Sequence, residues 1–291
     1  MRINQGNKLR EYLELSKLKI MVPVGLTGFA GYFIFDPHLS ARILITSFGI
    51  LLMAISASVL NQIQEVDLDR KMIRTSHRPL PTNRIKLGNA ILFFLLNIIA
   101  GMAAIYYGGN LKAVCIGLIT IFWYNGIYTY SKRITAFAVV PGAVTGALPP
   151  LIGWVAAGGG LWDKPIIFLE FLFFTGQIPH FWLLVLKYGE EYKRAGIPSL
   201  IDVFNPAQIN RLTFTWVVSS VSAALFLCYF EIIQSRLIIV ILLIASIYLI
   251  WQFFDLLKIN INNKDYRRCS IFLNLYFLLV LLLLIIDRII R

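Results

Sequence analysis

The sequence contains few charged side chains for its length. Asp, Glu, Lys and Arg make up 14% of the 291 residues, whereas a soluble domain carries about 25%. Hydrophobic residues make up 58%, and the mean hydropathy is +0.74. A chain with this composition cannot cover a water-facing surface with polar groups. The composition therefore argues against a soluble globular enzyme and predicts a polytopic membrane protein.

Cysteine is also scarce, and each of the three cysteines stands alone in an apolar segment. Cys115, Cys228 and Cys269 lack the spacing of a metal site, so we interpret them as small hydrophobic residues. The net charge is +12, but the sequence has no basic face beside stacking aromatic residues. This pattern favours membrane lipid over nucleic acid as the partner of the basic residues.

Apolar runs long enough to cross a membrane account for most of the chain. A spanning helix needs roughly 20 such residues. We identify nine candidate spans, at about 19–36, 42–62, 88–108, 111–129, 136–157, 165–187, 212–231, 236–257 and 269–288. The fifth contains Pro141, Pro149 and Pro150, so we expect it to be kinked or broken. No linker divides the chain, so residues 1–291 are expected to form a single transmembrane domain.

The basic residues are distributed unevenly between alternate loops. All but six of the 27 Lys and Arg residues lie in the N-terminal segment or in the loops that share its side. The six exceptions are Arg42, Lys112, Lys164, Arg236, Arg288 and Arg291. This bias predicts that the N-terminal segment 1–18 is cytoplasmic and that the C-terminus is outside. The two longest loops, about 63–87 and 188–211, then face the cytoplasm, where we expect the catalytic residues.

The first of these loops begins with a spaced set of polar residues. If the second span continues as a helix, Asn61, Glu65 and Asp69 fall within an arc of about 80° on one face. Asp67 falls on the opposite side. An amide and two carboxylates are hard oxygen ligands, which suit Mg²⁺ together with phosphate oxygens. The alternative interpretation is that these residues are ordinary interfacial charges at the end of a membrane helix.

Basic residues follow the acidic set directly. They include Arg70, Arg74 and Arg78, and guanidinium groups bind phosphate in a bidentate manner. Acidic residues that hold a metal and basic residues that hold phosphate together indicate a metal–diphosphate site. Such a site promotes the departure of a diphosphate leaving group.

The spaced set and the string Met-x-Arg-Thr-x-x-Arg-Pro-Leu, which includes Arg74 and Arg78, resemble the first motif of the UbiA superfamily of intramembrane prenyltransferases. The longer string most resembles the haem O synthase branch, which farnesylates protohaem IX. The resemblance implies an all-α transmembrane bundle of about nine helices around a central cavity. It further implies that Asn61, Glu65 and Asp69 bind Mg²⁺ and farnesyl diphosphate, and that Arg74 and Arg78 hold phosphate. Most members have Asp where this chain has Glu65.

Two later segments extend the candidate site. Lys132 and Arg133 either bind the diphosphate or are topological charges. Glu190, Glu191 and Tyr192 resemble the second acidic motif of the superfamily, with Lys187 one turn earlier as a further diphosphate ligand. Two acidic clusters on one side of the membrane suggest that two Mg²⁺ ions clamp one diphosphate.

Residues in the later spans are candidates for the acceptor substrate. His180 lies within a span, after Pro179, where an ionisable residue is a functional candidate. It could ligate haem iron, position the acceptor, or serve as a structural hydrogen-bonding group. His77 is a second candidate for the same roles. The resemblance adds the string ending at Trp154, and we expect acceptor contacts from His180, Tyr130, Tyr192 and Trp154.

The resemblance thus implies a specific reaction. The farnesyl group of farnesyl diphosphate would be transferred to a vinyl group of haem b, giving haem O. The expected location is the bacterial cytoplasmic (inner) membrane, with the site toward the cytoplasm. Haem A synthase or a terminal oxidase would be a downstream partner. Two alternatives remain: a prenyltransferase that acts on a quinone precursor or another aromatic acceptor, and a transporter or haem-handling factor without catalysis.

Overall fold

Helices make up all the regular secondary structure in the part of the chain that this computed structural model describes, residues 5–258 and 261–291. The α-helices are α1 (Gln5–Leu15), α2 (Leu18–Phe35), α3 (Ala41–Gln64), α4 (Val66–Lys71), α5 (Leu87–Gly108), α6 (Leu111–Phe122), α7 (Thr129–Ser131), α8 (Val139–Ala156), α9 (Lys164–Arg194), α10 (Pro206–Tyr229), α11 (Arg236–Phe253) and α12 (Asn263–Ile290). A π-helix, η1 (Trp123–Tyr128), joins α6 to α7, and short 3₁₀ turns occupy Leu200–Asp202 and Phe254–Leu257. The predicted all-α class is confirmed.

Within the described residues, nine helical segments are long and apolar enough to cross a membrane, as predicted. The sixth candidate span is longer than expected, because α9 continues to Arg194. The charged residues from Lys187 onward ended the apolar pattern, but they do not end the helix, since Glu, Lys and Arg are good helix formers. Residues 188–194 are therefore helical and not part of a loop.

The fifth candidate span is not broken. Helix α8 runs without interruption from Val139 to Ala156, with Pro149 and Pro150 inside it. Helix α2 packs directly against this stretch, and a Cβ atom on Gly31 would lie only 2.0 Å from the Pro150 carbonyl oxygen. Proline is tolerated inside a transmembrane helix where neighbouring helices support the backbone, and α2 provides that support.

The second span is interrupted where continuity was expected. Helix α3 ends at Gln64, and Glu65 leaves the helical conformation with φ −118° and ψ 15°. Helix α4 then restarts at Val66. The Asp69 amide nevertheless donates to the Glu65 carbonyl oxygen over 2.8 Å, which is the bond of a helical turn. The four-residue spacing between Glu65 and Asp69 therefore survives the interruption.

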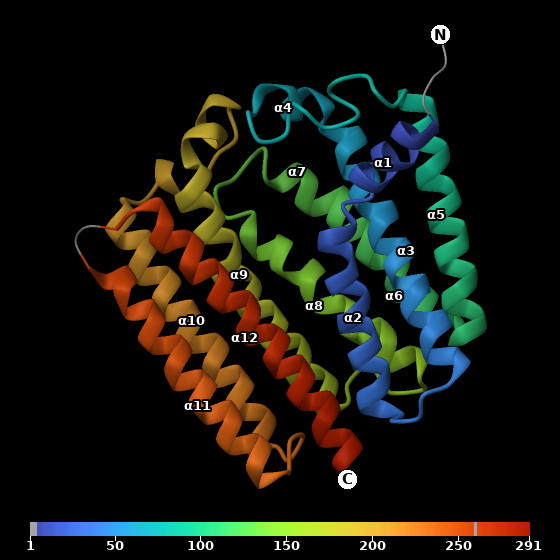
Figure 1. The fold of residues 1–291 in the computed structure, drawn as a ribbon, viewed down its shortest axis with the longest axis vertical. Coiled ribbons are helices and arrows are strands. Elements are labelled where there is room, and N and C mark those ends of the chain that lie inside the picture. Colours follow the sequence, from blue (N-terminus) through green and yellow to red (C-terminus); the bar gives the residue numbers. More distant parts are fainter. Residues whose placement is uncertain (1–4, 259–260) are drawn as a thin grey trace.

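The two ends of the bundle differ in Figure 1. Helices α1, α4 and α7 lie at one end, which we call the α4 end, and the C-terminus lies at the opposite end. Helix α9 also finishes at the α4 end, because Met72 after α4 packs with Ala195 and Ile197 after α9. The two charged loops of the sequence thus meet at one end of the bundle.

Candidate functional site

The structure buries the three polar residues of the first motif. Asn61, Glu65 and Asp69 are only 4%, 6% and 5% exposed. The Asp67 side chain is 91% exposed and has a weak ion pair with Arg70, at 3.4 Å. The geometry therefore separates Asp67 from the other acidic residues, as the helical projection requires.

Each buried carboxylate has a basic partner from a different part of the chain. Lys132 Nζ lies 2.5 Å from Glu65 Oε2, and Arg78 Nη1 donates to both Asp69 oxygens, at 2.8 and 2.9 Å. Burying a charge is costly unless it is paired, and these two pairs make the buried acids possible. Glu65 Oε1 is buried and has no hydrogen-bond partner among the described residues.

The π-helix positions the first motif and Lys132 relative to each other. Thr129 donates to the Tyr124 carbonyl oxygen, so its hydroxyl oxygen accepts a bond from Asn61 Nδ2 at 3.0 Å. This contact turns the Asn61 amide nitrogen toward α7 and its oxygen the other way. Nearby, the Asn125 side chain donates to Gln64 Oε1 and to the Ala57 carbonyl oxygen. π-Helical turns often mark functional sites, and this one ties η1 to the end of α3.

Lys17 is a member of this cluster that the sequence did not reveal. It caps α2 with φ 47° and ψ 41°, in the left-handed region. Burial and then the neighbouring Arg78 lower the pKa of Lys17 to about 7, although Asp69 acts in the opposite direction. The turn before it is fixed from α3, because Gln62 Nε2 donates to the Leu15 carbonyl oxygen over 2.7 Å.

The second acidic motif reaches the first through Glu191. The Arg74 amide donates to Glu191 Oε2 at 3.0 Å, and the Arg74 guanidinium lies 5.0 Å from the centre of the Tyr188 ring. Lys187 lies over the same ring at 4.8 Å, and Tyr192 packs beside Met72. Glu190 is exposed. The structure thus brings Glu191 and Tyr192 to the loop that carries Arg74.

Other predicted ligands occupy more peripheral places. Arg70 turns toward Asp67 and the Pro81 carbonyl oxygen. Arg133 donates to the Gln64 carbonyl oxygen at 2.7 Å and stacks on the exposed Tyr130 ring. Trp154 lies near the far end of α8, where its indole nitrogen donates to Asp163 at 3.0 Å. It is buried there and distant in the fold from α4.

The donor set fits magnesium in its chemistry. Within residues 5–258 and 261–291, no group of three or more His, Cys, Asp or Glu side chains is clustered as a metal site. Mg²⁺ does not require such a cage, because it binds one or two carboxylates together with waters and substrate phosphates. The unpartnered Glu65 Oε1 offers an oxygen that a cation would satisfy. Asn61, Glu65 and Asp69 could therefore hold Mg²⁺ together with a diphosphate.

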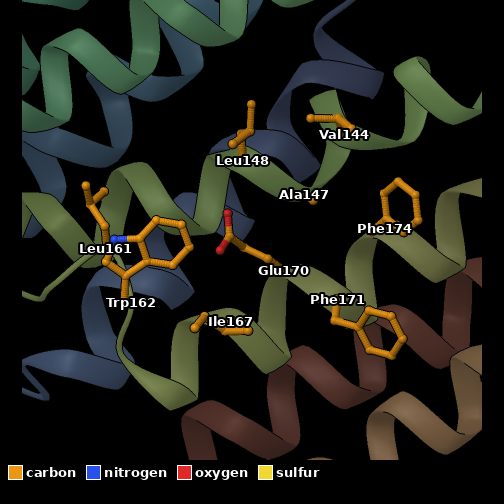
Figure 2. A pocket seen from close by; sticks show the side chains of 9 residues that line it. All are labelled: Val144, Ala147, Leu148, Leu161, Trp162, Ile167, Glu170, Phe171 and Phe174. Atoms are coloured by element: carbon orange, nitrogen blue, oxygen red, sulfur yellow. The ribbon is translucent and has the colours of Figure 1, made fainter.

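A groove of about 360 Å³ lies elsewhere, between α8 and α9. Figure 2 shows the carboxylate of Glu170 among apolar side chains, near Trp162 and Leu148. Ile167 and Phe171 on its rim are large exposed hydrophobic residues, as expected for a membrane-facing surface. The groove contains none of the residues of the acidic motifs.

The sequence pattern of the UbiA prenyltransferase family matches residues 22–281. The chain belongs to the UbiA prenyltransferase family. Three relatives are each named protoheme IX farnesyltransferase. The protein of Oleidesulfovibrio alaskensis is 31% identical over 97% of this chain and 98% of its own length. The proteins of Geobacter sulfurreducens and Solibacter usitatus are 38% and 37% identical over 65% and 68% of this chain, and over 70% and 71% of their own lengths.

Solved structures share the UbiA fold with this chain. A digeranylgeranylglyceryl phosphate synthase matches with a TM-score of 0.79 and 23% identity, over 98% of this chain and all of that one. A UbiA homologue from Archaeoglobus fulgidus, bound to GPP and Mg²⁺, matches with a TM-score of 0.64 and 17% identity, over 94% of this chain and 99% of its own. At these identities the likeness concerns the fold alone.

Proposed function

We propose that this UbiA-family chain transfers the farnesyl group of farnesyl diphosphate to a vinyl group of haem b, yielding haem O and diphosphate. The observation that carries the proposal is the full-length similarity to the Oleidesulfovibrio alaskensis protein, named protoheme IX farnesyltransferase. The acid–base cluster at the α4 end supports the diphosphate half of the reaction. The choice of haem b as the molecule that receives the farnesyl group depends on the names of the relatives.

The cluster supplies the charges that a diphosphate needs. Arg78 and Lys132 are paired with buried carboxylates in the free protein. Mg²⁺, when bound to Asn61, Glu65 and Asp69, would neutralise the leaving diphosphate. The two basic side chains could then turn from the carboxylates to the phosphate oxygens, and Lys17 lies beside them. The proposed role of the cluster is to stabilise the leaving group as the C–O bond breaks.

Aromatic rings adjoin the place where the cation would form. Tyr124 and Tyr128 are stacked with ring centres 5.5 Å apart, and Lys132 lies 5.5 Å from the Tyr128 ring centre. Aromatic faces attract cations, so these rings favour an allylic cation beside the departing diphosphate. The vinyl π electrons of haem b form the new C–C bond, and a water molecule then adds to the resulting cation with loss of a proton.

The remaining parts of the proposal concern location and partners. The proposed location is the cytoplasmic (inner) membrane of a bacterium, and the bias in basic residues supports an orientation with the α4 end toward the cytoplasm. The haem O product must pass to a protein that uses it, so a haem A synthase or a terminal oxidase is the proposed downstream partner.

The decisive experiment combines the purified protein with haem b, farnesyl diphosphate and Mg²⁺, followed by mass spectrometry of the porphyrins. We expect haem O to form, and chelation of Mg²⁺ to prevent it. Prenylation of a hydroxybenzoate or naphthoate offered in parallel, without haem O, would favour the quinone-precursor alternative instead. Binding of haem without diphosphate release under any condition would favour a non-catalytic role.

A matched pair of substitutions tests the cluster. Asp69→Asn should abolish turnover, since it removes a buried carboxylate that faces Arg78. Asp67→Asn makes the same chemical change two residues earlier, at an exposed side chain, and should retain activity. Equal activity of the two variants would refute the proposed role of Asp69.

A further inference from the structure

Two polar side chains that belong to neither acidic motif face each other in the membrane-spanning part of the bundle. His180 belongs to α9 and Asn274 to α12. Each lies more than ten residues inside its helix, or about 15 Å from the nearer end. Polar groups at this depth seldom face lipid, because hydrocarbon offers them no hydrogen-bond partner.

The packing of the two helices fixes their register. Gly176 of α9 lies against the ring of Phe277, to which a Cβ atom at that position would come within 1.8 Å. The ring centres of Phe173 and Phe277 are 6.1 Å apart. The two helices are antiparallel, so one helical turn toward the α4 end leads from Gly176 to His180 and from Phe277 to Asn274. This register places the Asn274 amide beside the His180 imidazole, in position to accept a hydrogen bond from it.

The pair formed by His180 and Asn274 is accessible to a ligand. His180 is half-buried and Asn274 is exposed, so a ligand can reach them. A hydrogen bond donated by one ring N–H to the Asn274 amide oxygen fixes the imidazole plane and its tautomer, which leaves the lone pair of the second ring nitrogen for a ligand. Metal-bound histidines in proteins generally have a partner of this kind on their other nitrogen.

The pair also adjoins the diphosphate cluster. The ring of Phe181, the next residue, lies 6.0 Å from the ring of Tyr128. Tyr128 in turn contacts Lys132, the partner of Glu65. A planar ligand centred at His180 therefore has one edge near the place where a prenyl cation would form.

We infer that His180 is an axial ligand to the iron of the haem acceptor, and that Asn274 is the positioning residue that orients its imidazole. The inference rests on the proposed function, since it assumes that the acceptor is haem. It places the porphyrin deeper in the membrane than the acidic cluster, with the rings of Tyr128 and Phe181 between them. It also assigns a role to an asparagine that lies outside both acidic motifs.

The sequence allows a clean spectroscopic test, because it contains only three histidines. His77 and His38 are both exposed, and His38 is paired with Asp36. Haem b titrated into the purified protein should give the absorption spectrum of an imidazole-ligated iron. His180→Ala should remove that spectrum and weaken haem binding at least tenfold, and added imidazole should restore it. His38→Ala and His77→Ala should leave it unchanged.

Asn274 is tested by the same spectrum. Asn274→Ala should weaken haem binding by about tenfold or more and alter the iron spectrum, whereas Asn274→Asp, which keeps a hydrogen-bond acceptor, should restore most of the native spectrum. Binding of farnesyl diphosphate should be unchanged in all variants, which shows that they are folded. An unchanged spectrum in His180→Ala would overturn the inference, as would an Asn274→Ala spectrum identical to the native one.

The outcomes also separate this inference from the proposed function. Haem O formation together with a native spectrum in His180→Ala would sustain the reaction and overturn the iron ligand. A His180-dependent spectrum without haem O formation would sustain the ligand and count against the reaction.

Discussion

Lys17 shows how one residue can serve a site at the expense of stability. Its backbone is in the left-handed region, which costs energy for a residue other than glycine. Its side chain lies among Arg78, Asp69, Lys132 and Glu65, where burial lowers its pKa to about 7. A lysine that is costly to charge in the free protein becomes favourable when an anion arrives, so we expect Lys17 to contact the diphosphate.

The substitution Lys17→Met tests this expectation. It should raise the KM for the prenyl diphosphate about ten- to hundredfold, because a hydrogen bond to a charged group contributes about 1.5–3 kcal/mol. It should also raise the melting temperature below pH 7. In that range the native protein bears the full cost of this half-buried charge. The cost declines as the pH rises from about 7 toward the ordinary lysine pKa of 10.5, so the difference in melting temperature should shrink there.

Lys19→Met is the control for this prediction. Lys19 is exposed and two residues away, so its loss should change neither KM nor the melting temperature appreciably. An equal rise in KM for both variants would point to a general electrostatic effect of the basic segment. A lower melting temperature for Lys17→Met would contradict the assigned cost of its charge.

The sequence could predict part of this cluster but not all of it. Asn61, Glu65 and Asp69 repeat every four residues, and that pattern holds across the break at Glu65 because Asp69 N still bonds to Glu65 O. No comparable sequence pattern marks Lys17. Its conformation depends on Gln62, 45 positions later in the sequence. Local patterns cannot reveal a turn that a distant helix imposes.

At the scale of elements, the close packing of α2 against α8 explains why two adjacent prolines do not break a helix. A Cβ atom on Gly153 would lie 1.9 Å from the Gly28 carbonyl oxygen, so the two backbones are in direct contact. The number of spans and their approximate bounds follow from hydropathy. The continuity of α8 does not, since it depends on which helix packs beside it.

The substitution Gly153→Ala should therefore be strongly destabilising. The new methyl group meets backbone, which cannot rotate away, and overpacking commonly costs about 1–3 kcal/mol and occasionally more. We expect a lower midpoint in denaturant unfolding, monitored in detergent by circular dichroism. Gly88→Ala is the matched control, because a Cβ atom there would have no neighbour within 4 Å. Comparable stability of the two variants would contradict the assigned α2–α8 contact.

At the scale of the whole molecule, the candidate site and most of the basic residues lie at the same end of the bundle. Lys17, Arg78 and Lys132 are both topological charges and neighbours of the buried acids. The sequence allowed either interpretation for Lys132 and Arg133. In the structure Lys132 pairs with Glu65, so a residue counted as a topological charge also lies at the acidic cluster. In the orientation proposed from the charge bias, the acidic cluster therefore faces the cytoplasm.

Single-cysteine labelling can test this orientation. In a background with Cys115, Cys228 and Cys269 replaced by alanine, Thr82→Cys places a thiol in the exposed loop after α4, and Leu39→Cys places one in the loop between α2 and α3. A membrane-impermeant maleimide should label Thr82→Cys only in inverted vesicles and Leu39→Cys only in intact cells. One candidate span, α3, separates the two loops, so they should be accessible from opposite sides of the membrane. Labelling of Thr82→Cys from outside the cell would reverse the proposed orientation. The acidic cluster and its diphosphate substrate would then face away from the cytoplasm.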